Sequence, residues 1–295
     1  MIRIFGWILC AVLVPVTLMA ESDERFFEIQ QTRLASSDVF EIRDAIDKLT
    51  FVKSSLGIRD IISALEGTSH FPTSPRNAPA VKFYAAQALG KKGDKIAIPY
   101  LIKTYQKESN NIPEHNPQKV RTWKDGVADS SSPSSPYFYD DGEIPITLAC
   151  GEILRALGSL PLTAESESTI KSALTSPNFY LRSSAADAVY LSGKTEFLSS
   201  LLDTLGKETV PYAKISLLSA VVGLERLPNQ NYKSVLESLT NKDPEVRAKA
   251  SDALRRLDFR TSAPYLEKVI QSENNAKVLK QMKSDYQFLV SFHAP

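Results

Sequence analysis

Three histidines and two cysteines are the side chains of this sequence best suited to catalysis or metal binding, and their surroundings do not favour either. His70 lies in a proline-rich loop without a neighbouring His, Cys or paired carboxylate, and His115 and His293 also lie outside the regular apolar segments. Cys150 takes a position that other repeats fill with a small residue, so we interpret it as an inert, packed thiol. We therefore predict no catalytic residue, no metal site and no cofactor.

Two short motifs resemble known binding loops but lack residues that those loops require. Ser192 to Thr195 ends like a phosphate-binding loop, yet Ala188 stands where the loop needs a glycine, and the segment follows a predicted helix. Asp140, Asp141 and Glu143 lack the alternating spacing of a calcium loop. No Gly-x-Ser-x-Gly elbow occurs either. A binding or structural role is thus favoured over catalysis.

Six segments share an apolar pattern that is typical of helices packed between other helices. In the clearest copy, Val246, Ala250, Ala253 and Leu254 share one face of a helix that begins at Asp243 and Pro244. The six stripes begin at residues 42, 81, 146, 181, 213 and 246. Apart from one longer interval, between the second and third stripes, this is a regular repeat whose period is typical of a helical solenoid.

A second, shorter apolar segment follows each of these six stripes. The segments carry apolar residues at spacings of three and four, and they cover 58–65, 96–105, 170–174, 197–205, 232–239 and 264–270. Each unit is therefore a predicted helical hairpin, which can bury both of its faces only by stacking on its neighbours. We predict an all-α fold: a right-handed α-solenoid of about six stacked helical hairpins.

These units resemble the HEAT repeats, including the bacterial phycobilisome-lyase-like branch. The resemblance is carried by D-P-E-V-R-A-K-A-S-D-A-L at 243–254, by residues 80–90 and 93–101, and by L-R-S-S-A-A-D-A-V at 181–189. It implies a HEAT-like or armadillo-like superhelix whose first helices line the concave face. It also implies a ladder of charged residues, which we interpret as structural, formed by Arg43, Lys82, Arg182, Lys214, Asp243 and Arg247. Thr147, Pro177 and Thr209 depart from the pattern and predict a break in the middle.

The resemblance also bears on possible activities. The HEAT-like enzyme deoxyhypusine hydroxylase carries a di-iron site on His-Glu pairs, and no histidine here is followed by Glu. The phycobilin lyases act on a cytoplasmic pigment and apoprotein, which an exported chain would not meet. Neither activity is therefore expected of this chain.

Residues 1–20 combine a basic Arg3, an apolar middle and a small Ala20, and four polar or acidic residues follow. This pattern predicts a secretory signal peptide and a periplasmic or extracellular protein of a bacterial envelope, with 21–295 forming the solenoid. Left uncleaved, the segment would be a membrane anchor. The remaining 34 basic and 34 acidic side chains give no long-range field to attract nucleic acid.

An insertion at about 108–142 accounts for the long interval between two stripes, and we expect it to interrupt one unit between its two helices. Its tract D-S-S-S-P-S-S-P at 129–136 predicts a flexible arm. The aromatic residues that follow, Tyr137, Phe138 and Tyr139, either fold back onto the solenoid or bind a partner.

Two functions follow as hypotheses. The first is a non-enzymatic exported scaffold that binds a protein or peptide on its concave face and arm, through Tyr137, Phe138, Tyr139, Phe83, Tyr84, Tyr180, Tyr190 and Tyr212. The alternative is a lyase-like maturation factor or small-ligand-binding protein with a pocket under the insertion. An open apolar groove would favour the first, and a buried cluster of carboxylates with His or Arg at that pocket would favour the second.

Overall fold

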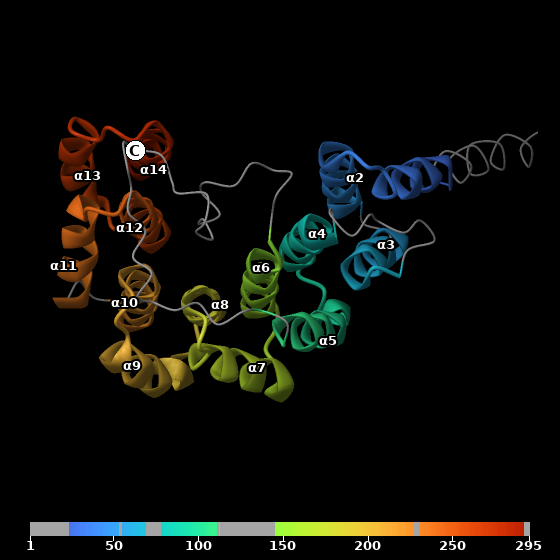
Figure 1. The fold of residues 1–295 in the computed structure, drawn as a ribbon, viewed down its shortest axis with the longest axis horizontal. Coiled ribbons are helices and arrows are strands. Elements are labelled where there is room, and N and C mark those ends of the chain that lie inside the picture. Colours follow the sequence, from blue (N-terminus) through green and yellow to red (C-terminus); the bar gives the residue numbers. More distant parts are fainter. Residues whose placement is uncertain are drawn as a thin grey trace, which may run out of the picture.

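The computed structural model describes residues 24–52, 55–68, 78–110, 112, 145–226 and 230–291. Within these ranges the chain forms helices joined by turns, without a strand. Figure 1 shows the helices arranged as an arc, with one helix of each hairpin along the inside and the other along the outside. The all-α fold of stacked hairpins predicted from the apolar stripes is thus confirmed.

The six inner helices coincide with the six predicted stripes. They are α2 (Val39–Phe51), α4 (Ala78–Lys92), α6 (Ile146–Ser159), α8 (Phe179–Ser192), α10 (Pro211–Glu225) and α12 (Pro244–Leu257). The outer helices are α3 (Ser55–Glu66), α5 (Ile98–Ser109), α7 (Ala164–Leu174), α9 (Leu198–Lys207), α11 (Gln230–Glu237) and α13 (Ala263–Ile270). A helical stretch at 24–34 precedes them, and α14 (Ala276–Ser291) packs against α12 and α13 at the other end.

Local signals explain where the inner helices begin. The side chains of Asp38, Asn178 and Asp243 accept hydrogen bonds from backbone amides in the first turns of α2, α8 and α12. Pro211 and Pro244 occupy the first helical positions of α10 and α12, where no hydrogen bond needs the missing amide hydrogen. Caps and periodicity together fix the hairpins, and the apolar stripes become the core.

Small residues let the central inner helices approach closely. A Cβ atom on Gly158 of α6 would lie 2.2 Å from the carbonyl oxygen of Ala188 on α8. One on Gly223 of α10 would lie 2.4 Å from the ring of Tyr190. The backbones of α6 and α8 can therefore touch, and Tyr190 can cross over α10.

The insertion joins α5 to α6, so it links two hairpins; the expectation that it interrupts a single unit was wrong. The reason is that its boundaries fall after an outer helix and before the next inner helix. Residues 113–144, and with them Tyr137, Phe138, Tyr139 and His115, lie outside the described residues, as do His70, His293 and the segment 1–23.

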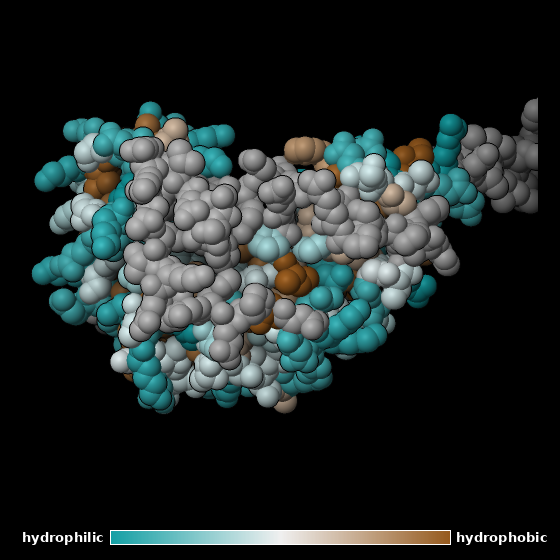
Figure 2. All heavy atoms as spheres, viewed as in Figure 1, coloured by the Kyte–Doolittle hydropathy of each residue, from teal (hydrophilic) through white to brown (hydrophobic). Residues whose placement is uncertain are grey.

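Along the outer helices, the face of the described chain seen in Figure 2 is mainly hydrophilic. Figure 2 shows hydrophilic residues over the outer helices, with hydrophobic residues in small, separate groups. No helix within the described ranges is both long and apolar enough to span a bilayer.

Candidate functional site

Asp187, on the inner helix α8, is the centre of a buried charged cluster. Its Oδ2 atom lies 3.1 Å from Nε of Arg155 on α6 and 2.8 Å from Nζ of Lys249 on α12. Its Oδ1 atom lies 2.9 Å from Nη1 of Arg256, also on α12. Asp187 and Lys249 are each only 2% exposed. One carboxylate thus holds three cations that come from hairpins on both sides of its own.

Further ion pairs extend the cluster in both directions. Glu152 pairs with Arg155 at 3.2 Å within α6, and Asp252 pairs with Arg256 at 3.0 Å within α12. Arg255 bridges Asp252, at 2.7 Å, and Asp285 of α14, at 3.1 Å. Ser251 donates to Asp285 at 2.6 Å. The network therefore ties together α6, α8, α12 and α14.

Three tyrosines predicted to contact a partner surround this cluster. Tyr180 and Tyr212 are buried and stack with ring centroids 6.1 Å apart. Arg155 lies over the Tyr180 ring at 5.6 Å, and Lys249 lies over the Tyr212 ring at 5.5 Å. Tyr190 lies beside Arg256 and donates its hydroxyl proton to the Arg256 carbonyl. The rings thus pack against the cations, and their contact with a partner stays a prediction.

The other two predicted aromatics, Phe83 and Tyr84, lie on α4, outside this cluster. Their rings meet edge to face with centroids 5.4 Å apart, and Tyr84 is buried. Arg43 of the preceding inner helix lies over the Tyr84 ring at 5.5 Å. Tyr84 therefore joins α4 to α2.

The electrostatics of the cluster are dominated by burial and by the three cations. Burial alone would raise the pKa of Asp187, but Arg256, Lys249 and Arg155 overcome it and hold the pKa well below its ordinary value. Burial also lowers the pKa of Lys249 to about 8, and Arg256 and Arg155 act in the same direction against Asp187. The carboxylate is therefore ionised at neutral pH.

The cluster links helices that are far apart in the sequence. Lys249 and Arg256 reach from α12 to Asp187 of α8, past the intervening helix α10. Both oxygens of Asp187 accept from cations, and among the described residues no group of His, Cys, Asp and Glu could hold a metal ion. We interpret the cluster as a brace that fixes the curvature of four consecutive hairpins.

A second arrangement of charged residues recurs along the stack. In it, a basic residue on an inner helix pairs with a Glu that follows it by 26 residues, and we call this pair the clamp. Arg182 binds Glu208 through two hydrogen bonds of 2.7 and 2.9 Å, and Arg247 binds Glu273 through two of 2.6 and 2.7 Å. In both, Nη1 also donates to two loop carbonyls five and six residues earlier. Lys82 pairs with Glu108 at 3.6 Å with the same spacing.

The clamps differ from the expected ladder in their acidic partner. Asp243 caps α12 through the Glu245 amide, whereas the acids bound to the arginines are Glu208 and Glu273. The reason is that a short Asp at the start of a helix is best placed to accept from its own first turn. Arg43 lies 3.9 Å from Asp47 of its own helix. The signal that could have found the clamps is the constant spacing of 26 residues between base and acid.

The residues of the Asp187 cluster were missed by sequence reasoning for a different reason. Lys249 and Arg256 are 62 and 69 residues away from Asp187, and no local pattern links them. The only hint is that a charged residue stands among the small residues of α8 and of α12.

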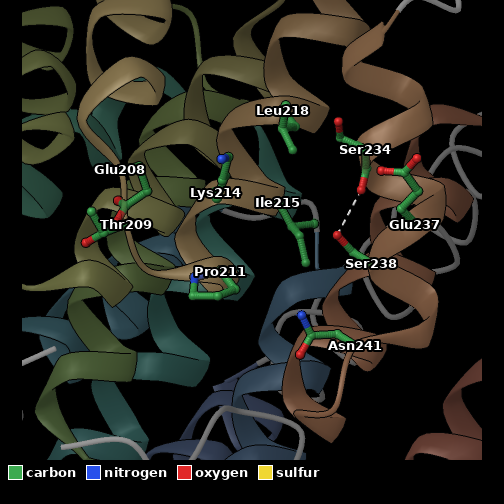
Figure 3. Close-up of a pocket in the computed structure, with 10 residues that line it drawn as sticks. All are labelled: Glu208, Thr209, Pro211, Lys214, Ile215, Leu218, Ser234, Glu237, Ser238 and Asn241. Atoms are coloured by element: carbon green, nitrogen blue, oxygen red, sulfur yellow. Dashed lines mark hydrogen bonds between the residues drawn. The ribbon is translucent and has the colours of Figure 1, made fainter. Parts of the chain in front are cut away.

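Three hollows line one edge of the solenoid, where the outer helices end and the next inner helices begin. The first, of about 290 Å³, lies between the ends of α5 and α7, and the second, of about 580 Å³, between α7 and α9. The third, of about 590 Å³, lies between α10 and α11. Figure 3 shows it, with Pro211, Lys214 and Ile215 contributed by α10 and Ser234 and Ser238 by the opposite side.

Neighbouring hollows share lining residues. Thr175 and Ser176 belong to the first and second, and Glu208 and Thr209 belong to the second and third. The three therefore form one continuous edge, which we call the trough. Its lining mixes apolar, hydroxyl and charged side chains, so it differs from the open apolar groove that the scaffold hypothesis anticipated, and the Asp187 cluster does not line it.

Comparison with known proteins finds the repeat but no close relative. Residues 81–107 match the model of the PBS lyase HEAT-like repeat. No curated protein sequence matches the chain. The solved structure of human deoxyhypusine hydroxylase in complex with glycerol is 14% identical, with 93% of this chain and 99% of that chain covered and a TM-score of 0.34.

An engineered protein of solved structure is similar at the same level. It is 15% identical, with 90% of this chain and 96% of that chain covered and a TM-score of 0.33. At these scores neither likeness supports a statement about the activity of this chain. What the helices and the repeat match establish together is a HEAT-like repeat solenoid of stacked helical hairpins.

Proposed function

We propose that this protein is a scaffold that binds an extended segment of another polypeptide along the trough. The single observation that carries the proposal is the continuity of the three hollows from α5 to α11. A continuous edge that repeats once per hairpin suits a ligand that is itself linear and repetitive, and an extended peptide is such a ligand.

The dimensions of the two partners agree. Packed helices lie about 8–10 Å apart, and an extended chain advances about 3.3 Å per residue. About three peptide residues therefore span one hairpin, and a segment of about ten residues would cover the trough. Its lining offers hydroxyl groups and both signs of charge, which are suitable partners for peptide backbone groups and polar side chains.

The Asp187 cluster supports the same function by keeping the trough in one shape. A binding surface that is already rigid loses little conformational entropy when its ligand arrives.

We further propose that binding takes place outside the cytoplasm and leaves the partner chemically unchanged. The basis is the signal-like composition of residues 1–20 and the lack of a catalytic constellation in the sequence. Fractionation of the native cell, with the mature N-terminus read by mass spectrometry, tests the location. Recovery of an uncleaved chain in the cytoplasm would contradict it.

The experiment that tests binding is selection of peptides from a random decapeptide library on residues 21–295. Enriched peptides should lose affinity when Thr175→Trp and Thr209→Trp fill the shared parts of the trough. Glu267→Trp, on the exposed side of α13, is the matched control and should change nothing. If no peptide is enriched, or if the enriched peptides bind both trough variants as well as the parent, the proposal fails.

The second candidate is a small-ligand-binding or maturation protein, and the Asp187 cluster is the observation in its favour. Carboxylates, arginines and a lysine of lowered pKa gather there as they do in many ligand sites. It ranks second because the cations already occupy both oxygens of Asp187. Native mass spectrometry of the protein from its own envelope would reverse this order if a bound small molecule disappeared in Asp187→Asn.

A further inference from the structure

Lys214 of α10 stands at the position of the base in the clamp, but its acid is missing. The Glu bound by Arg182 and the Glu bound by Arg247 each also accept from the backbone amide two residues ahead, just before the next helix begins. After Lys214 that place is taken by Asn241, which accepts from the Asp243 amide in the same way but carries no charge. Lys214 is exposed, and of the described acidic residues none forms an ion pair with it. This hairpin therefore has half of a clamp.

The empty half of the clamp belongs to the third hollow. In the two complete arginine clamps, the base also binds the loop carbonyls five and six residues before it. The corresponding positions before Lys214 are Thr209 and Glu208, and both line the hollow of about 590 Å³ together with Lys214. Figure 3 shows these three residues on the same side of the hollow, facing Ser238 and Asn241.

We propose that an acidic side chain of the partner enters this hollow and pairs with Lys214, completing the clamp from outside. The proposal rests on the proposed function and names the chemistry of its ligand. The two complete clamps supply the internal template, because each places a carboxylate within hydrogen-bonding reach of the base at this position.

The other charged groups at the hollow are consistent with a carboxylate ligand. Glu208 accepts from Nε and Nη2 of Arg182, and its side chain is fully buried, so it is already engaged in the clamp of the preceding hairpin. Glu237 lies at the rim, 4.0 Å from Lys233 one turn away, and it opposes an incoming anion. Lys214 is the base that faces the hollow, and removal of the Glu237 charge should strengthen binding.

The test compares two labelled ten-residue probes of Ser, Thr and Gly, both with an amidated C-terminus, that carry either one central Glu or one central Gln. Fluorescence anisotropy at low salt should show the Glu probe binding about fivefold more tightly to the parent, as fits a partly exposed ion pair. The ratio should fall to about one in Lys214→Met. It should fall likewise in Asn241→Glu, which supplies the missing acid from within the chain. Glu237→Gln should increase the affinity for the Glu probe.

Asn241→Glu separates a direct contact from a loss of structure, because an internal clamp should raise the melting temperature while it removes the preference for the acidic probe. Equal affinity of the two probes for the parent, or a preference that survives Lys214→Met, would overturn the inference. If both probes bind equally and Thr209→Trp abolishes both, the trough function stands and only the role of Lys214 is refuted. If neither probe binds, this inference fails. Whether the trough binds peptides is then tested separately by the decapeptide library.

Discussion

Replacement of Asp187 by Asn tests whether the buried charged cluster braces the solenoid. The substitution keeps the shape of the side chain but removes the negative charge that faces Arg155, Lys249 and Arg256. Lys249 is the most affected, since it is 2% exposed and bulk water cannot replace the carboxylate. The variant therefore leaves buried positive charges facing one another.

The expected cost is large for a single substitution. Removal of one partner from a buried ion pair destabilises proteins by about 3–5 kcal/mol, because the other charge stays desolvated. Since a domain of this size loses roughly 2–4 °C of melting temperature per kcal/mol, the melting temperature should fall by about 10 °C. The double variant Asp187→Asn/Lys249→Met should recover part of the loss, because the most deeply buried uncompensated charge is gone.

Calorimetry gives the melting temperatures, and hydrogen exchange shows where stability is lost. Exchange should accelerate in α8 and α12, which the cluster joins, more than in α2 and α3 at the far end of the arc. Asp203→Asn, on the exposed side of α9, is the matched control and should change stability by less than about 0.5 kcal/mol.

A cost of under about 1 kcal/mol for Asp187→Asn would refute the brace, because a buried charge left without its partner costs several times more. A double variant less stable than the single one would refute it as well. Either result would mean that packing alone holds the inner helices and that the cluster is incidental.

Three further predictions follow from the same structure. Gly158→Ala should destabilise the protein by about 1–3 kcal/mol in a chemical denaturation series, because the new Cβ would lie 2.2 Å from the Ala188 backbone. Gly206 faces open space, so Gly206→Ala should be neutral or stabilising. Arg247→Lys should lower stability by about 1–3 kcal/mol, because an ammonium cannot bind Glu273 and two loop carbonyls together. Arg260→Lys, at an exposed turn, is the control and should leave stability unchanged. Equal melting temperatures for these two variants would contradict the clamp. The folded state depresses the pKa of Asp187, so the contribution of its charge to stability is present above the ordinary pKa of 3.8 and is lost as the pH falls toward the folded pKa. The difference in melting temperature between the parent and Asp187→Asn should therefore shrink below about pH 4. A difference that stays constant from pH 7 to pH 2 would exclude this linkage.

Much of the fold was predictable from the sequence because its determinants are local. In the apolar stripes that begin at Val81, Leu181 and Val246, the spacing of the apolar residues places them on one side of a helix. The capping residues Asp38 and Asp243 mark where two of these helices begin. Stacking then follows, since one hairpin cannot bury both faces. The clamps were within reach of the same analysis, because the spacing of 26 residues between base and acid is constant.

Tertiary structure alone decided the charged cluster and the trough. Asp187 meets Arg256, 69 residues away, because the stack curves enough for α12 to reach across α10 to α8, and curvature is a property of many interfaces at once. The hollows are likewise spaces between side chains of different hairpins. The sequence by itself determined which residues turn toward the core of each hairpin, whereas the angle between successive hairpins determined which charges meet and which surfaces stay open.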